Sequence, residues 1–332
     1  MKTLVLLFLL IYASEAASQE LQKEISVHDP VMIKQGNTFY VFATGRGINV
    51  WSSKDQVNWK RERPVFSEGP QWAIKVVKGF KDFIWAPDIQ FINGKYYLYY
   101  CVSTFGKNTS AIGVATNVTL DEESASFKWE DKGLVLESIP GKTNWNAIDP
   151  NVFIDAKKNA WLTFGSFWGG IQLLKLNKDL VSVSVQNLKA IKTIANYERA
   201  ANADAEETQA NAIEAPFVFK KGKYYYLFAS VGFCCRGSKS TYRMIVGRSK
   251  QVSGPYLDEK GRDMNDGGGL LVMKGNAYWY GVGHNAAYTF DGADFLVFHG
   301  YDAKDKAKPK LRIEQITWKN GWPSVASALR LN

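Results

Sequence analysis

The sequence predicts an all-β fold, a five-bladed β-propeller with four short antiparallel strands in each blade. The first observation is that five segments of the 332-residue chain share one plan. Each has an acidic or polar site, a short apolar strand, a turn and an aromatic strand, and such alternation is a hairpin signal. The second is the abundance of rings, with 11 Trp, 16 Tyr and 19 Phe, which suit sheet packing. Repeated four-strand units are typical of propellers.

The five segments follow one another along the chain, each with its polar site, first strand, turn and aromatic strand in that order. They are His28-Asp29-Pro30 with VMI, QGN and TFYVFATG; Ala86-Pro87-Asp88 with IQFI, NGK and YYLYYCVS; Ile148-Asp149-Pro150 with NVFI, DAKKN and AWLTFGSF; Ile213-Glu214-Ala215-Pro216 with FVF, KKGK and YYYLFASVG; and Gly283-His284-Asn285 with AAYTF, DGA and DFLVFHGY.

A third strand is expected in each blade at INVWSS, AIGVATN, GIQLLKLN, RMIVGRS and LRIEQITW, and a fourth strand or loop fills the remainder. The polar anchors at 29, 88, 149, 214 and 284 are separated by 59, 61, 65 and 70 residues. Two stacked sandwich domains are the alternative, but they do not explain five equivalent anchors. We therefore expect one catalytic propeller domain over residues 25–332.

The stretch 186–212 interrupts the pattern because it is Ala-rich, polar and poor in strand signals. We expect a long loop or a short helix between blades three and four, ending just before Glu214. It either overhangs the site or is a passive surface insertion, since long loops can be either.

The N-terminus has the pattern of a secretory signal peptide over residues 1–16. Met1 and Lys2 precede the apolar run 4–13, and small residues around Ala16 offer a cleavage site. The run is too short to span a bilayer, and no later segment reaches the ~18 apolar residues of a membrane helix. A buried N-terminal strand is the alternative. The signal predicts a secreted protein, extracellular or periplasmic, with no membrane partner.

The five anchors should converge, because the first strand of each propeller blade lines the central channel. Asp29, Asp88, Asp149, Glu214 and His284 would then surround one mouth. Several carboxylates at such a place indicate glycoside hydrolysis, which needs one carboxylic acid to protonate the leaving oxygen and one carboxylate to activate water or attack carbon. A single Asp-Pro is also a common turn, but three acidic anchors in different blades favour chemistry.

These motifs resemble glycoside hydrolase family 43, whose fold is a five-bladed propeller. The resemblance is carried by the Asp29, Asp149 and Glu214 segments and extends from about His28 to Trp318. Further pieces resemble the endo-1,5-α-L-arabinanases of that family, namely Trp85-Ala86-Pro87-Asp88, Asn146-Ala147, Gly165-Ser166-Phe167-Trp168-Gly169-Gly170, Cys234-Cys235-Arg236-Gly237, Ser240-Thr241-Tyr242, Gly254-Pro255-Tyr256 and Gly283-His284-Asn285.

The resemblance implies a role for each carboxylate. Asp29 matches the general base, Glu214 the general acid, and Asp149 the third carboxylate, which orients the acid and keeps its pKa high. A nearby anion does raise the pKa of a carboxyl group. The family inverts configuration, which predicts carboxyl groups of Asp29 and Glu214 about 6.5–9.5 Å apart.

The same resemblance implies a metal and several substrate contacts. His284 matches a histidine that helps to hold a cation, usually Ca²⁺, in the central channel. Calcium takes about six to eight oxygen ligands, and no acidic calcium loop is present, so water would supply most of them. The candidate substrate contacts are Trp85, Asp88, Phe105, Asn146 and Trp168; core packing is the alternative for the aromatic rings.

Charge and cysteine content add little about the substrate. The formal charge is +9, arabinan is neutral, and the acidic pectin that carries it could attract a basic enzyme. No basic-aromatic stripe is present, so nucleic acid is not expected. Cys234 and Cys235 are either bridged or reduced, and Cys101 should be a buried thiol.

We expect a secreted endo-acting α-1,5-L-arabinanase, a monomer, acting on the arabinan side chains of pectin. An exo-α-L-arabinofuranosidase or β-xylosidase on the same scaffold is the enzymatic alternative. A carbohydrate-binding propeller without activity is the other, although a binder needs no acid, base and orienting carboxylate.

Overall fold

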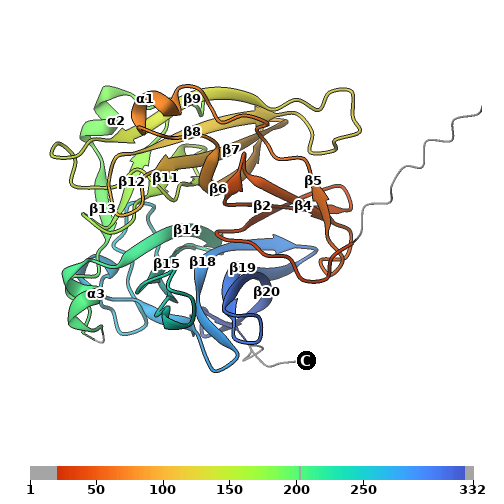
Figure 1. Ribbon diagram of the computed structural model, residues 1–332. Coiled ribbons are helices and arrows are strands. Elements are labelled where there is room, and N and C mark those ends of the chain that lie inside the picture. The colour runs from red at the N-terminus through yellow and green to blue at the C-terminus, as the bar shows by residue number, and fades with distance from the viewer. Residues whose placement is uncertain (1–20, 202, 326–332) are drawn as a thin grey trace, which may run out of the picture.

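The computed structural model describes residues 21–201 and 203–325 and confirms the five-bladed propeller. The segment expected to be a signal peptide lies outside the described residues. Figure 1 shows the sheets following one another around a common centre in chain order, so that the first and last blades lie side by side. This arrangement brings segments far apart in the sequence to one axis.

Each blade is an antiparallel sheet in which neighbouring strands also follow one another in sequence, and a short extra strand, β3, extends the second. The strands are β1 (Val31–Gln35), β2 (Thr38–Ala43), β4 (Asn49–Ser53) and β5 (Lys60–Glu62); β3 (Gly45–Arg46), β6 (Phe83–Ile92), β7 (Lys95–Ser103), β8 (Ser110–Asn117) and β9 (Glu130–Ser138); β10 (Asn151–Ile154), β11 (Ala160–Phe164), β12 (Ile171–Lys175) and β13 (Lys192–Ala195); β14 (Ile213–Lys221), β15 (Tyr224–Val231), β16 (Arg243–Ser249) and β17 (Leu270–Lys274); β18 (Trp279–Phe290), β19 (Ala293–Asp302), β20 (Lys308–Lys319) and β21 (Trp322–Val325).

The first strands of the blades form a closed ring. β1 contacts β6, β6 contacts β10, β10 contacts β14, β14 contacts β18, and β18 contacts β1. The segment before β1 helps to close the ring, because the carbonyl of Ile25 accepts a hydrogen bond from Leu311 in β20 at 3.1 Å, and Gln22 pairs with Trp59 in the first blade. Ile25 and Val27 are buried there.

One residue at the start of each first strand has a left-handed backbone, which is uncommon for a residue other than glycine. We call these five the corner residues: Asp29, Ala86, Asp149, Ala215 and His284, with φ between 39° and 55°. Proline follows four of them and Asn285 the fifth. In blades two, four and five the strand is irregular at the corner, as a β-bulge requires.

The corner residues correct the alignment of the blades expected from sequence. In blade two the corner is Ala86, and Asp88 lies two residues beyond it, after the bulge. In blade four the corner is Ala215, and Glu214 lies one residue before it. Because a bulge redirects the strand that follows, Asp88 and Glu214 do not occupy equivalent positions.

The corner amides are bound by the preceding blade. In each blade, one residue at the end of the second strand lies opposite the residue that precedes the corner. In four blades the side chain of this residue accepts the amide hydrogen of the corner residue in the next blade, an arrangement we call the corner clasp. Thr44 Oγ1 accepts from Ala86 (2.9 Å), Cys101 Sγ from Asp149, Ser230 Oγ from His284 (2.8 Å) and His299 Nδ1 from Asp29 (3.2 Å). Gly165 occupies this place in blade three, and there a carboxylate oxygen of Asp149 accepts from Ala215 (3.1 Å).

The stretch 186–212 holds more structure than its sequence predicts. It contains most of α2 (Val185–Lys189), all of β13, which is the fourth strand of blade three, and α3 (Ala205–Gln209). The prediction of a loop or helix alone was therefore wrong for residues 192–195. The buried Glu207 of α3 binds Arg243 of β16 at 2.7 Å, which fixes this helix on blade four.

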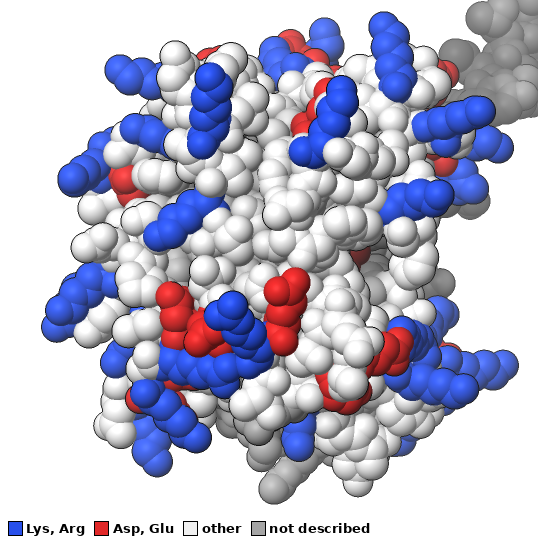
Figure 2. Space-filling model, turned by 90° about the vertical axis from the view of Figure 1, so that its left-hand side faces the viewer, with Lys and Arg blue, Asp and Glu red and all other residues white. Residues whose placement is uncertain are grey.

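Outside the sheets lie α1 (Ala73–Val76) and two 3₁₀ turns, Gly237–Lys239 and Met264–Asp266. Among the described residues no helix is both long and apolar enough to cross a bilayer. On the side of the molecule that carries α3, Lys and Arg side chains are spread over the surface with acidic side chains among them (Figure 2). This face therefore has no continuous basic stripe.

Candidate active site

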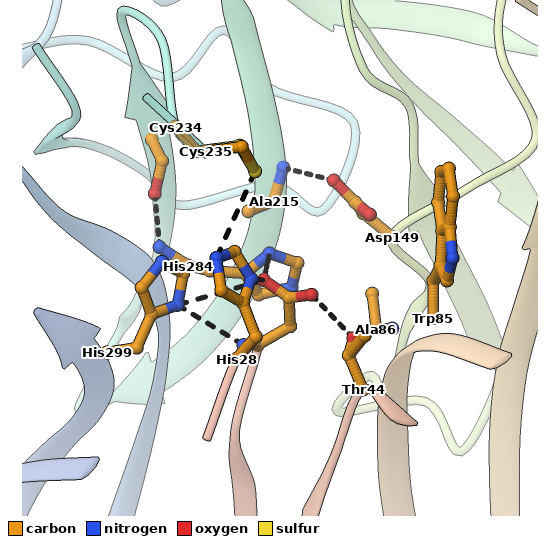
Figure 3. Close-up of polar contacts among 12 residues, drawn as sticks. His28, Thr44, Trp85, Ala86, Asp149, Ala215, Cys234, Cys235, His284 and His299 are labelled. Carbon is orange, nitrogen blue, oxygen red and sulfur yellow. Dashed lines mark hydrogen bonds and ion pairs between the residues drawn. A yellow bond between two sulfur atoms is a disulfide. The ribbon is translucent and has the colours of Figure 1, made fainter. Parts of the chain in front are cut away.

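Asp29 lies at the centre of a cluster of histidines. Its Oδ1 is 2.8 Å from Nδ1 of His28 and 3.0 Å from Nδ1 of His284, and its Oδ2 accepts a 2.5 Å hydrogen bond from Thr44. In Figure 3 the rings of His28, His284 and His299 gather on one side, with Thr44 and Trp85 on the other. Both oxygens of Asp29 are thus held by the protein.

The cluster keeps Asp29 ionised. Burial opposes ionisation, but the charges of His28 and His284 outweigh it and hold the pKa of Asp29 well below 3.8. For His284, burial opposes protonation, but the charges of Asp29 and Asp149 raise the pKa to about 9. Burial, with the charge of His28, holds the pKa of His299 well below 6.5, so this ring is neutral and accepts the amide hydrogen of Asp29.

Asp149 and Glu214 are held in the opposite state. Both side chains are buried, and Glu214 accepts a 2.7 Å hydrogen bond from Ser166. Burial is the largest cause that raises the pKa of Asp149 to about 8, with the charge of Glu214 adding to it, and burial also raises the pKa of Glu214. Burial, more than the neighbouring anion expected from sequence, therefore keeps a proton on this pair.

Asp88 requires a correction. Its side chain is only 1% exposed, and its Oδ2 accepts the amide hydrogen of Val152 at 2.8 Å in the next blade. Asn151 holds the equivalent place in blade three and accepts from Val218 at 2.9 Å. Asp88 is therefore a link between blades and does not face a substrate.

The other four predicted substrate contacts differ in exposure. Asn146 is buried, and its Oδ1 accepts from Ser110 at 2.6 Å, so that oxygen is already bonded. Trp85 is partly buried and stands beside Asp149 in Figure 3. Phe105 is 78% exposed in the loop between β7 and β8, and Trp168 is 37% exposed.

The loop carrying Trp168 is strained. Phe167 and Trp168 both have positive φ, 55° and 41°, a costly backbone that persists where surrounding contacts impose it. The side-chain amide of Asn211 donates to the carbonyl of Trp168 at 2.7 Å, and the backbone amide of Phe167 donates to the carbonyl of Ile213 at 3.0 Å. These two hydrogen bonds hold the strained backbone of Phe167 and Trp168 against residues 211–213, just before Glu214.

Cys234 and Cys235 form a disulfide, which settles the alternatives left open by the sequence, and Cys101 is a buried free thiol as predicted. The bridge stands over the cluster (Figure 3), with the Cys235 amide donating to the Tyr301 hydroxyl at 2.7 Å and its sulfur 3.9 Å from Nε2 of His28. Tyr301 in turn contacts the same nitrogen at 2.9 Å.

Sequence reasoning assigned no role to several residues that contact the carboxylates. Thr44 and His299 bind Asp29, Ser166 binds Glu214, and the buried Tyr242 interacts with Glu214 as well. Thr44 and His299 share one position in their blades, opposite the residue that precedes the corner. An alignment of the repeats at this position could have identified both.

A cation would find few protein ligands here. Nδ1 of His284 is occupied by Asp29, which leaves only its Nε2. The described residues with closely spaced ligand atoms are His28, Asp29 and His299, and two nitrogens and one carboxylate are a poor match for calcium. The donor set thus fits a largely hydrated ion on His284 and not a protein cage.

The site as a whole combines an ionised carboxylate with a buried carboxyl pair that retains a proton, the arrangement required for general acid–base catalysis. The sequence profile of "Glycosyl hydrolases family 43" matches residues 23–323. The chain belongs to glycosyl hydrolase family 43. Its fold and the recognised arabinanase-type motifs agree with that assignment.

The similar proteins are named arabinofuranosidase or arabinanase. The chain is 52% identical over 304 residues to the extracellular exo-α-(1→5)-L-arabinofuranosidase ArbA of Cellvibrio japonicus, covering 91% of this chain and 87% of that protein. It is 41% identical to the extracellular endo-α-(1→5)-L-arabinanase 1 of Bacillus subtilis, covering 94% and 91%. The solved Cellvibrio cellulosa α-L-arabinanase complexed with arabinohexaose superposes with a TM-score of 0.86 at 50% identity, covering 92% and 97%.

Proposed function

We propose that this family-43 hydrolase cleaves α-1,5-L-arabinofuranosyl linkages of arabinan with inversion of configuration. The observation that carries the proposal is the pairing of an ionised Asp29 with a protonated Asp149–Glu214 pair. A glycosidase needs one carboxylate and one carboxylic acid at once, and the relatives named above act on the same linkage.

In this mechanism Asp29 is the general base. It accepts a proton from the water that attacks the anomeric carbon, and its low pKa keeps it ready to do so at every ordinary pH. Glu214 is the general acid and gives its proton to the departing sugar oxygen. Asp149 positions the acid, and the share of the proton between Asp149 and Glu214 keeps the acid form available near neutrality.

The mode of cleavage follows the stronger similarity. Identity is 52% to the exo-acting relative and 41% to the endo-acting one, so we propose release from a chain end. This revises the endo mode predicted from the motifs, which the Bacillus relative still supports as the second candidate.

A product profile on linear arabinan tests both modes, with debranched and branched arabinan and xylan as further substrates. Short products of one size from the first minutes indicate exo cleavage, whereas a ladder of oligomers with a rapid fall in viscosity indicates endo cleavage. The absence of products from all four polysaccharides would contradict hydrolysis and favour a binding propeller.

We also propose a hydrated Ca²⁺ on Nε2 of His284, a nitrogen that must release its proton when the ion binds. When bound, it would supply positive charge near the carboxylates. Elemental analysis of the purified protein should find the ion, and His284→Ala should lose it while the fold remains. A protein without a cation, and insensitive to chelators, would refute this assignment.

Secretion is proposed from the N-terminal pattern and from relatives named extracellular. A mature N-terminus at Ala17 in protein recovered from outside the cytoplasm is expected. The natural substrate would be the arabinan of pectin, and a single species at monomer mass is expected in light scattering.

A further inference from the structure

Thr44 lies directly after β2 and contacts Asp29 from the side opposite the histidines. Its backbone is fixed at both ends, because its amide donates to the carbonyl of His28 at 3.0 Å and its carbonyl accepts from the side chain of Asn49 at 3.0 Å. The fixed backbone therefore holds the side chain of Thr44 beside the carboxylate of Asp29.

The direction of the hydrogen bonds at Thr44 follows from the corner clasp. Its hydroxyl accepts the amide hydrogen of Ala86 at 2.9 Å. Cys101, Ser230 and His299 accept the corresponding amide hydrogens in other blades. A hydroxyl has a single proton. The proton of Thr44 consequently points to Oδ2 of Asp29, 2.5 Å away, as a charge-assisted donor.

The other oxygen of Asp29 is held separately. Oδ1 faces Nδ1 of His28 and Nδ1 of His284. These two partners restrain the carboxylate through Oδ1 alone. The bond from Thr44 holds the second oxygen, Oδ2, so that the plane of the carboxylate is restrained from both sides.

We propose that Thr44 is a positioning residue for the general base: the amide of Ala86 orients its hydroxyl, which fixes the Asp29 carboxylate toward the attacking water. The inference rests on the proposed function, in which Asp29 is the base. A base held in one orientation needs no reorganisation when the proton transfers, and misplacement of such a group lowers turnover more than binding.

Three substitutions at Thr44 test the proposal on the full-length enzyme with linear arabinan. Thr44→Val keeps the shape and removes the hydroxyl; kcat should fall about 10- to 100-fold, the cost of one hydrogen bond to a charged group, with KM within about twofold. Thr44→Ser should restore kcat to within about threefold of the wild type.

Thr44→Cys separates the two bonds. A thiol can accept the amide hydrogen of Ala86, as Cys101 accepts that of Asp149 in the next blade, but it is a weak donor to Asp29. We expect a melting temperature close to that of the wild type and a kcat still about 10-fold lower. This variant keeps the test decisive if Thr44→Val does not fold.

Thr163→Val is the matched control. Thr163 is a fully buried threonine near the end of β11, its hydroxyl lies 3.3 Å from the carbonyl of Asn151, and it has no recorded bond to the three carboxylates. The loss of its hydroxyl should leave kcat unchanged. A fall in kcat like that of Thr44→Val would make the effect a general one of buried hydroxyls and overturn the proposal.

Asp29→Asn distinguishes a failure of the proposed base, Asp29, from a failure of the proposed role of Thr44. If Asp29→Asn stays active, the assignment of the base is wrong and the proposed mechanism fails. If Asp29→Asn is inactive while folded Thr44→Val and Thr44→Cys turn over as fast as the wild type, only the role of Thr44 is overturned. In the Asp29→Asn background, Thr44→Val should cause no further loss.

Discussion

At the scale of single residues, carboxylates gathered at one axis are held in different protonation states. Histidine charges overcome burial at Asp29, whereas burial prevails at Asp149 and Glu214. The same buried centre holds these groups in different states because Asp29 is hydrogen-bonded to both His28 and His284, whereas Asp149 and Glu214 feel the charge of His284 without a hydrogen bond to it.

Asp29→Asn and Glu214→Gln should each lower turnover by at least about 10²-fold, since a positioned acid or base contributes about 10²–10⁴-fold. Both changes preserve size, so circular dichroism and the melting temperature should change little. A substrate with a good leaving group needs little protonation and should rescue Glu214→Gln far more than Asp29→Asn. The reverse pattern of rescue would exchange the two roles, and full activity in both variants would place the site elsewhere.

At the scale of elements, the bulge in the first strand decides which side chains reach the site. Residues at or before the corner, such as Asp29, Asp149 and Glu214, join the central cluster of ionisable side chains. Residues after it face the neighbouring blade, as Asp88 and Asn151 do. Within a few residues of one strand, side chains of the proposed active site thus give way to side chains that bind the next blade.

Asp88→Ala should reduce stability and leave catalysis unchanged. The buried amide of Val152 would lose its partner at a cost of about 1–3 kcal/mol, which we expect to lower the melting temperature by about 3–8 °C. KM and kcat should equal those of the wild type. Trp168→Ala provides the contrast, since an exposed sugar contact should raise KM without affecting melting; a raised KM in Asp88→Ala would restore its role in substrate binding.

Cys101 offers a second test at this scale. Its buried sulfur accepts the amide hydrogen of Asp149 and donates to the carbonyl of Trp85 at 3.3 Å. Cys101→Val removes both bonds, so we expect lower stability and a several-fold lower kcat through displacement of Asp149. Cys101→Ser keeps a donor and an acceptor and should approach the wild type in both measurements. Equal behaviour of the two variants would show that the sulfur only fills space.

At the scale of the whole molecule, the closed ring of first strands concentrates ionisable groups in its buried centre, and this affects stability. Asp29 has a depressed pKa, so its stabilising contribution is present above about pH 3.8 and is lost as the pH falls further. His284 has a raised pKa, so its contribution is complete below about pH 6.5 and is lost as the pH rises through about 9.

Asp149 acts in the opposite sense to Asp29. Because its pKa is raised to about 8, the folded protein holds a proton that the unfolded chain releases near pH 3.8, and stability falls as the pH rises between these values. We expect the highest melting temperature at about pH 4–6. Scanning calorimetry from pH 3 to 10 checks this, and Asp149→Asn should raise the melting temperature more at pH 8 than at pH 5. A wild-type optimum above pH 8 would contradict the prediction.

The sequence by itself determined the number of blades and most of their strands, and it predicted that Asp29, Asp149 and Glu214 come together at the axis. Hairpin alternation and Gly/Asn turns are local signals, and they recur at a near-constant period. Strand β13 was not predicted because its short sequence, KTIA, lies in an Ala-rich polar stretch where no local pattern distinguishes it.

Only the tertiary structure decided which polar residues meet. The bulge at Ala86 and Pro87 displaces Asp88 from the corner, and its carboxylate binds the amide of Val152 in the next blade, although its position in the repeat resembles that of Asp29, Asp149 and Glu214. His299 reaches Asp29 from the second strand of blade five, 270 residues away, whereas Thr44 follows the second strand of blade one, 15 residues from Asp29. The contact of His299 depends on how blades five and one are packed around the ring, and the contact of Thr44 depends on how the two ends of the first hairpin meet within blade one. Neither strand periodicity nor local spacing encodes these contacts.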